Sequence, residues 1–190
     1  MDASGRYAGG VILALDSATR TGAAWGEPGG TPKLETVNFG KPLIGPLRDV
    51  APKGDNEGDM FGRALVWITR KIDPAYEFGV DVKLIVIEGL VPQYDKTIQC
   101  GLWAVFCGVA ATKNIPVVVA PIQTWRAFVL GDGRIKKEAA KTRAVQTVTH
   151  LGWEADSHDA AEAGCIWLWA CSQVAPRLAP RIPLFMRGAA

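Results

Sequence analysis

The sequence predicts an α/β domain in which a mixed β-sheet carries helices on both faces. Two apolar runs, Val11–Asp16 (VILALD) and Lys83–Glu88 (KLIVIE), have the length and composition of buried strands. In the second half of the chain such runs alternate with segments of helical periodicity, which is typical of parallel strands joined by right-handed crossovers. The chain has 190 residues and is 48% hydrophobic, so we expect one domain, residues 1–190, with flexible ends at about 1–9 and 176–190.

The first half predicts an antiparallel meander followed by a helix. After the strand at Val11–Asp16, turn residues precede short strand candidates at Gly22–Gly26 and Leu34–Gly40. Residues 41–57 are rich in Pro and Gly and predict an exposed loop. Apolar residues then recur at helical spacing from Phe61 to Ile72.

The second half alternates strands and helices. After the strand at Lys83–Glu88 we expect a helix, a third buried strand and a short helix, at Thr97–Lys113, Ile115–Ala120 and Pro121–Leu130. A basic Gly-rich loop, GDGRIKK, leads into a helix whose apolar stripe includes Ala140 and Ala144. The last helix, about Ser157–Val174, is apolar nearly all round past Glu162, which predicts that it is buried.

Composition excludes several classes of protein. No apolar run reaches about 18 residues without a charge, so a membrane span is not expected. The apolar N-terminal run contains Asp16 and does not have the form of a signal peptide. The four cysteines (Cys100, Cys107, Cys165, Cys171) form no CxxC pair, which argues against a zinc ribbon and favours free, buried thiols in a reducing cytoplasm.

The formal net charge of +2 hides an uneven distribution. Between Thr112 and His150 the chain carries seven basic residues against Asp132 and Glu138. A basic segment of this kind is able to bind a polyanion, although clustered Lys and Arg also form ordinary solvated helix faces.

Carboxylates stand at the ends of both buried strands. Asp16 ends VILALD and Glu88 ends KLIVIE, and burying an unpaired charge is costly. Ligands of open α/β sheets gather at the carboxyl ends of adjacent strands. If these strands are neighbours, Asp16 and Glu88 converge on one site; otherwise each caps a strand exit in solvent.

Asp156 and Asp159 form a second acidic pair. Three residues apart, they share one face at the start of the last helix, and Glu162 extends that face. A plain capping role is the alternative, because acids are favoured at a helix N-terminus. Four carboxylates in one place repel unless cations neutralise them, and oxygen ligands suit Mg²⁺ or Mn²⁺. Two such ions would activate water and stabilise the leaving oxygen in phosphodiester cleavage.

Three segments, in order, carry a family resemblance: ILALDSATRTGAAWG, LIVIEG and ADSHDAAEA. They resemble the acidic motifs of the RuvC-type Holliday junction resolvases, in the ribonuclease H-like superfamily, and the phage-borne branch as much as the bacterial one. The first motif contributes Asp16, Arg20, Thr21 and Gly22, and the third is similar to the family's D-x-x-D-A pattern as Asp156-Ser-His-Asp159-Ala. GDGRIKKEAAK resembles the family's G-x-G-x-x-x-K loop, and this resemblance implies that Lys137 contacts DNA phosphates.

The resemblance implies a ribonuclease H-like, five-stranded mixed sheet in order 3-2-1-4-5, a homodimer, and two Mg²⁺ or Mn²⁺ ions per site. It implies symmetric nicking of a four-way DNA junction in the cytoplasm of a bacterial or phage-infected cell, and leaves a branch-migration partner open. The resemblance implies that the catalytic metal ligands are the matching residues of this sequence: Asp16, Glu88, Asp156 and Asp159. The family's Pro-Gly after the first Asp is replaced by Ser17-Ala18, and the loop GLVPQYDKT after Glu88 diverges.

Other residues are candidates for supporting roles. His158 is a possible proton carrier or outer ligand, with a plain surface position as the alternative. Tyr94 is a candidate for stacking on an unpaired junction base, or for ordinary loop packing. Trp125 beside Arg126 is the tryptophan to examine for DNA contact. The expected phosphate contacts are Arg20, Lys96, Arg134, Lys136, Lys137, Lys141 and Arg143.

Three alternative functions stay open. The segment from Asp16 to Gly22 also resembles the first phosphate loop of actin-like ATPases, but those need a second half for which 190 residues leave no room. A looser nuclease acting on flaps, forks or RNA–DNA hybrids would use the same acids. A catalytically inert junction-binding module is the third, although a DNA-binding surface gains nothing from carboxylates near phosphates.

Overall fold

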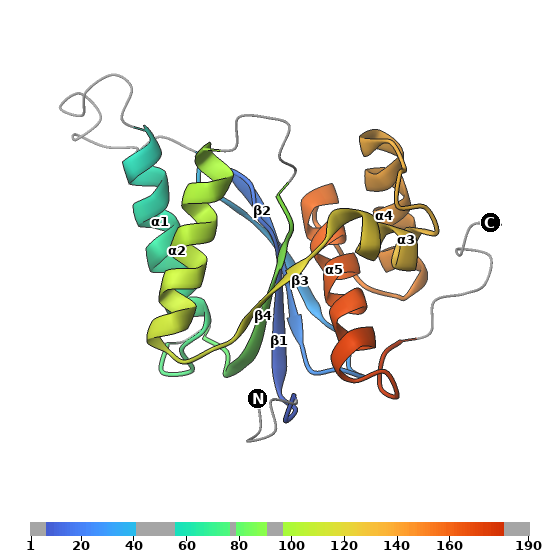
Figure 1. Ribbon diagram of the computed structural model, residues 1–190, viewed down its shortest axis with the longest axis horizontal. Helices are drawn as coiled ribbons and strands as arrows, with labels where there is room; N and C mark the ends of the chain where they lie inside the picture. Colours follow the sequence, from blue (N-terminus) through green and yellow to red (C-terminus); the bar gives the residue numbers. More distant parts are fainter. Residues whose placement is uncertain (1–6, 41–55, 77–78, 91–96, 181–190) are drawn as a thin grey trace.

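A computed structural model describes residues 7–40, 56–76, 79–90 and 97–180. In these residues a twisted β-sheet lies between two layers of helices (Figure 1). The expected flexible ends and the loop at 41–57 lie largely outside the described residues, and Tyr94 and Lys96 lie wholly outside them.

The sheet has the predicted topology. β1 (Val11–Asp16), β2 (Arg20–Gly26) and β3 (Lys33–Asn38) form an antiparallel meander. β4 (Val82–Glu88) pairs in parallel with β1, and β5 (Val117–Ala120) pairs in parallel with β4. The strand order β3-β2-β1-β4-β5 confirms the five-stranded mixed sheet expected from the sequence.

Helices cover both faces of the sheet. α1 (Asn56–Lys71) and α2 (Thr97–Thr112) lie on one side (Figure 1). α3 (Ile122–Leu130), α4 (Lys137–His150) and α5 (His158–Val174) lie on the other. Among the described residues, no helix combines the length and hydrophobicity needed to cross a bilayer.

Alternate residues of the central strands enter two separate cores. Ile12 and Ala14 of β1 pack with α3, α4 and α5, whereas Leu13 and Leu15 pack with α1 and α2. This two-residue period follows from the pleat of a strand that is buried on both faces. Leu84 and Val86 of β4 share the core of Ile12. The next residues of the same parity are Asp16 and Glu88, so both acids belong to the face covered by α5.

Two sequence-based expectations differ from the structure. β5 was expected to be a buried strand, yet Val118 and Val119 are 37% and 44% exposed. β5 is the last strand in the sheet order, and an edge strand is only partly covered. Of the cysteines, Cys165 and Cys171 are buried, Cys107 is half-buried and Cys100 is exposed on α2, so buried thiols describe only part of the set.

Candidate active site

Asp16 and Glu88 meet because β1 and β4 are parallel neighbours. Leu15 pairs with Ile87 in the sheet, so the two acids follow directly after paired residues and face the same side. Their carboxyl groups share a hydrogen bond. The carboxyl ends of two central strands thus carry one acidic pair, as the sequence predicts.

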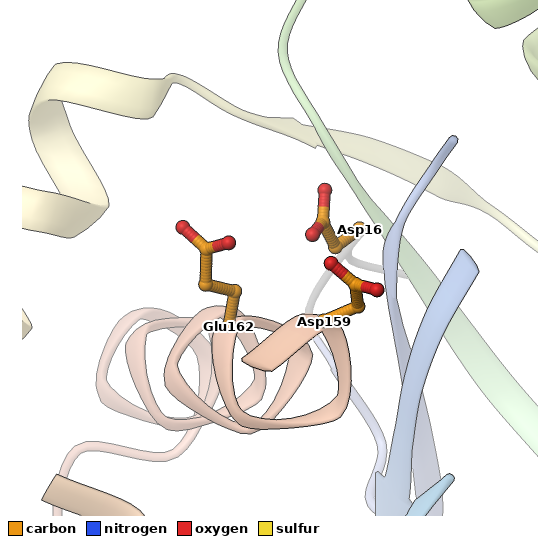
Figure 2. A group of neighbouring side chains, drawn as sticks. All are labelled: Asp16, Asp159 and Glu162. Atoms are coloured by element: carbon orange, nitrogen blue, oxygen red, sulfur yellow. The ribbon is translucent and has the colours of Figure 1, made fainter. Parts of the chain in front are cut away.

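The first turns of α5 add two more carboxylates. Ser157 caps the helix by accepting a hydrogen bond from the backbone N–H of Ala160 at 3.1 Å. Asp159 lies in the first turn, and Glu162 follows one turn later on the same side of the helix. Asp16, Asp159 and Glu162 each offer a carboxylate oxygen within 4.8 Å of the other two, and Figure 2 shows the three side chains converging.

A glycine permits this convergence. Gly22 on β2 pairs with Asp16 across the sheet. A Cβ atom built on Gly22 would lie 1.9 Å from the carbonyl oxygen of Asp159, far inside any tolerated contact. The head of α5 therefore rests directly on the backbone of β2, and only glycine allows so close an approach. This explains the Gly of the first sequence motif.

The turn after Asp16 is held by two side chains. Thr21, which is fully buried, donates its hydroxyl hydrogen to the carbonyl of Ala18 at 2.6 Å. Gln99 of α2 donates from Nε2 to the carbonyl of Ser17 at 3.1 Å. These bonds fix the backbone where the chain leaves Asp16, and they give Thr21 of the first motif a structural role.

Burial, together with the crowding of like charges, raises the pKa of two acids. The pKa of Asp16 is raised well above its usual range, first by burial and then by Glu88, Glu162 and Asp159. Burial, followed by Glu88, raises the pKa of Glu162 to about 7, while the positive charges of Arg126 and Lys141 act in the opposite direction. A pKa near 7 means that Glu162 takes up a proton close to neutral pH, and a bound cation would displace that proton.

Glu162, Glu88 and Asp159 each have a hydrogen-bonding or charged partner. Arg126 of α3 contacts the Oε1 atom of Glu162 from a terminal guanidinium nitrogen at 3.1 Å, and both side chains are largely buried. The indole N–H of Trp125 donates to Oε1 of Glu88 at 3.1 Å. Nε of Arg20 lies 3.4 Å from Oδ2 of Asp159, so the expected phosphate contact Arg20 is here the partner of an acid.

Asp156 is engaged elsewhere. Its Oδ1 accepts a hydrogen bond from the Thr36 hydroxyl at 2.8 Å, and its Oδ2 accepts one from the Thr36 backbone N–H at 3.3 Å. The structure thus brings together three of the four expected ligands, places Asp156 against edge strand β3, and adds Glu162. The sequence contained the signal, because Asp159-Ala-Ala-Glu162-Ala repeats the acid-x-x-acid-Ala spacing one step later.

The basic candidates lie mainly on one segment. Arg134, Lys136 and Lys137 are exposed around the start of α4. Lys141 is half-buried and close enough to lower the pKa of Glu162. Arg143 donates from Nη1 to the carbonyl of Leu130 at 3.0 Å, which ties α4 to the end of α3.

The remaining candidates are His158 and Trp125. His158 is exposed at the first residue of α5, beside Asp159. Trp125 is fully buried, which removes it as a base-stacking residue in this conformation.

The donor set suits a hard divalent cation. Asp16, Asp159 and Glu162 offer only carboxylate oxygens, and Glu88 adds a fourth carboxylate through its hydrogen bond with Asp16. Oxygen donors match Mg²⁺, Mn²⁺ or Ca²⁺, whereas zinc sites are usually built with histidine or cysteine. These residues could therefore hold a metal ion at the carboxyl end of the central strands.

The sheet order and the acids at the ends of β1 and β4 place the chain in the class of ribonuclease H-like α/β folds. Neither a protein-family model nor a curated protein matches the sequence. Solved structures do match. A Thermus thermophilus RuvC structure aligns with a TM-score of 0.54 at 14% identity, over 86% of this chain and 97% of that one.

A second structure, T. thermophilus RuvC in complex with a Holliday junction substrate, also aligns with a TM-score of 0.54. Its identity is 17%, over 83% of this chain and 90% of that one. The two matches cover most of both chains. The chain therefore has a RuvC-like fold.

Proposed function

We propose that this protein is a divalent-metal-dependent endonuclease that resolves four-way DNA junctions by paired nicks. The observation that carries the proposal is the group of carboxylates at the ends of β1 and β4 and the head of α5. The RuvC-like fold and the three acidic sequence motifs support the same substrate class.

The proposed ligands are Asp16, Glu88, Asp159 and Glu162. Asp16 interacts with all three of the others, which makes it the ligand best placed to serve two ions. Two bound Mg²⁺ or Mn²⁺ ions would supply an activated water and a counter-charge for the leaving 3′ oxygen. The protein's own task is to hold these carboxylates together and oriented in a partly buried site.

The proposed DNA path follows the basic residues beside the site. The exposed side chains of Arg134, Lys136 and Lys137 surround the N-terminus of α4, where backbone N–H groups also favour phosphate. Such contacts set position and contribute a salt-dependent share of affinity, but they do not read sequence. We propose that Tyr94 and Lys96, which follow β4 in the sequence, also contact the DNA.

We also propose that two copies act together through α2. The helix carries no charged residue, and the positions described as exposed are all small and uncharged: Cys100, Ala104, Gly108, Ala111 and Thr112. An uncharged helix face on the surface is typical of an interaction site. Two copies would supply the two active sites that paired nicks require.

The test is cleavage of a synthetic four-way junction, a matched linear duplex and a flap, each with Mg²⁺, with Mn²⁺ and with EDTA. Paired, metal-dependent nicks in opposing strands of the junction alone are the expected result. The Asp16→Asn variant should bind the junction at least as well, because it loses a charge that repels phosphate, and should not cut.

The other outcomes separate the alternatives. Cutting of every branched substrate would indicate a looser structure-selective nuclease. Binding without cutting in either metal would favour an inert junction-binding module. Normal cleavage by Asp16→Asn would remove the whole assignment of the site.

A further inference from the structure

Helix α3 contributes two consecutive donors, Trp125 and Arg126, to the acidic group. Trp125 is fully buried in the core between the sheet and helices α3, α4 and α5. Its single polar atom, the indole N–H, is a donor only and bonds Oε1 of Glu88 at 3.1 Å. A phenylalanine would bury a similar apolar ring without bringing a polar atom into the interior.

The topology explains why this donor reaches Glu88. Glu88 and Ala120 are paired at the ends of the parallel strands β4 and β5, and the N–H of Gly89 bonds the carbonyl of Ala120 at 2.8 Å. α3 begins immediately afterwards, at Ile122, so its first turn stands beside the end of β4. Trp125 lies on that turn, with its ring in the core and its N–H at the acid.

Glu88 needs such an anchor. It lies close to Asp16 and Glu162, and after burial its charge is the largest cause of the raised pKa of each. An unsupported glutamate has several rotamers by which it is able to move away from like charges. A hydrogen bond from a rigid, buried ring to one oxygen favours one rotamer and keeps the carboxyl group beside Asp16.

We propose that Trp125 is a positioning residue that orients Glu88 as a ligand of the divalent cation. This inference rests on the proposed function, because it assumes that the acidic group binds metal. Groups that hydrogen-bond a metal-ligating carboxylate commonly change metal affinity by about 10–100-fold when removed. Trp125 is neutral, so its removal changes orientation without changing the charge of the site.

The test compares two tryptophan substitutions. Trp125→Phe removes the donor to Glu88. Trp167→Phe is the matched control, because Trp167 is also fully buried and also donates its indole N–H, at 3.3 Å, to the carbonyl of Gly26 at the opposite end of β2 from the site. Mn²⁺ and Mg²⁺ binding to the metal-free proteins is measured by isothermal titration calorimetry, with the melting temperature of each protein recorded alongside.

Trp125→Phe should bind Mn²⁺ about 10–100-fold more weakly than the wild type, and Trp167→Phe should bind it within about 3-fold. In the cleavage assay, the Mg²⁺ concentration that gives half-maximal rate should rise by the same factor for Trp125→Phe, with most of the rate recovered at saturating Mg²⁺. A general loss of packing would instead lower both variants' affinities together.

Three results would overturn the proposal or its basis. Equal affinity of wild type and Trp125→Phe would overturn the role of Trp125 and leave the metal site standing. Equal losses in both variants would reduce it to a packing effect. A wild type that binds neither cation would overturn the proposed function itself, and this inference with it.

A second variant covers the case in which Trp125→Phe does not fold. Incorporating 3-benzothienylalanine at position 125 replaces the indole N–H by sulfur and keeps the ring's size. It should reproduce the 10–100-fold loss of cation affinity. Unchanged affinity in this protein would also overturn the proposal.

Discussion

At the scale of single residues, two acids compete for one role. Asp156 and Glu162 both stand three residues from Asp159, on opposite sides of it in sequence. The structure binds Asp156 to Thr36 and groups Glu162 with Asp16 and Asp159. Tertiary contacts therefore determine which of the two acids joins Asp16 and Asp159, and substitutions test this directly.

We expect Glu162→Gln to lower junction cleavage by about 100-fold or more, because it removes a charged ligand from the metal site. Asp156→Asn should leave cleavage within a few-fold and lower the free energy of unfolding by about 1 kcal/mol, the usual worth of a hydrogen bond. Cleavage rates at saturating Mg²⁺ and urea unfolding curves measure the two effects. The reverse order of activities would return the ligand role to Asp156.

The raised pKa values predict how stability depends on pH. The pKa of Glu162, about 7 in the folded protein, exceeds its ordinary value of 4.5, and the pKa of Asp16 is also raised. As the pH falls, these two acids take up protons in the folded state before they do so in the unfolded state. The free energy of unfolding therefore rises as the pH falls. In EDTA, we expect the melting temperature to rise by roughly 3 °C from pH 8 to pH 6.

Two comparisons check the origin of that trend. Glu162→Gln cannot titrate at this position and should show a flatter pH dependence in EDTA. Added Mg²⁺ competes with the protons, so its stabilising shift should be larger at pH 8 than at pH 6. A wild-type melting temperature that decreases when the pH is lowered from 8 to 6 would contradict the assignment of protons to this site.

At the scale of elements, the site depends on how closely α5 meets β2. The strands supply Asp16 and Glu88 by register, but Asp159 and Glu162 arrive only because the head of the helix touches the backbone at Gly22. The contact between one helix terminus and one strand thus joins the two halves of the acidic group.

Gly22→Ala should separate these elements. The new methyl group would overlap the Asp159 carbonyl, so we expect the free energy of unfolding to fall by about 1–3 kcal/mol or more, together with the affinity for Mn²⁺. Gly62→Ala is the control, since Gly62 is exposed on α1 with no atom within 4 Å of a new Cβ, and alanine should add up to about 1 kcal/mol to the helix. Wild-type cation affinity in Gly22→Ala would show that the close contact is not needed.

At the scale of the whole molecule, local patterns predicted the elements well. The strands at Val11–Asp16 and Val82–Glu88 follow from apolar runs that end in a carboxylate, and neighbouring parallel strands bring the two acids together. The exposure of β5 did not follow, because a strand's place in the sheet depends on which partners it finds and not on its own sequence.

The details of the site were harder to predict for the same reason. Thr36 engages Asp156 from 120 residues away in sequence, and Trp125 reaches Glu88 from 37 residues away. Helical spacing shows which acids share a face, but not which of them a distant strand will bind. Sequence therefore indicated the chemistry of the site, and the packing of α3, α5 and β3 determined its members.

The last prediction concerns the assembly of two molecules. If α2 forms the interface, Ala104→Arg should place a charge at the centre of its uncharged exposed face and yield monomers in sedimentation, whereas Ala104→Ser should remain dimeric. Each monomer keeps its acidic group, because the four proposed ligands lie on β1, β4 and α5 and none lies on α2. The arginine variant should therefore still bind Mn²⁺ with wild-type affinity. It should, however, nick the two strands of a junction independently. On a supercoiled plasmid with a cruciform, independent nicking gives nicked circles in place of linear product. Dimers of Ala104→Arg would move the interface away from α2, and linear product from a proven monomer would remove the need for a dimer altogether.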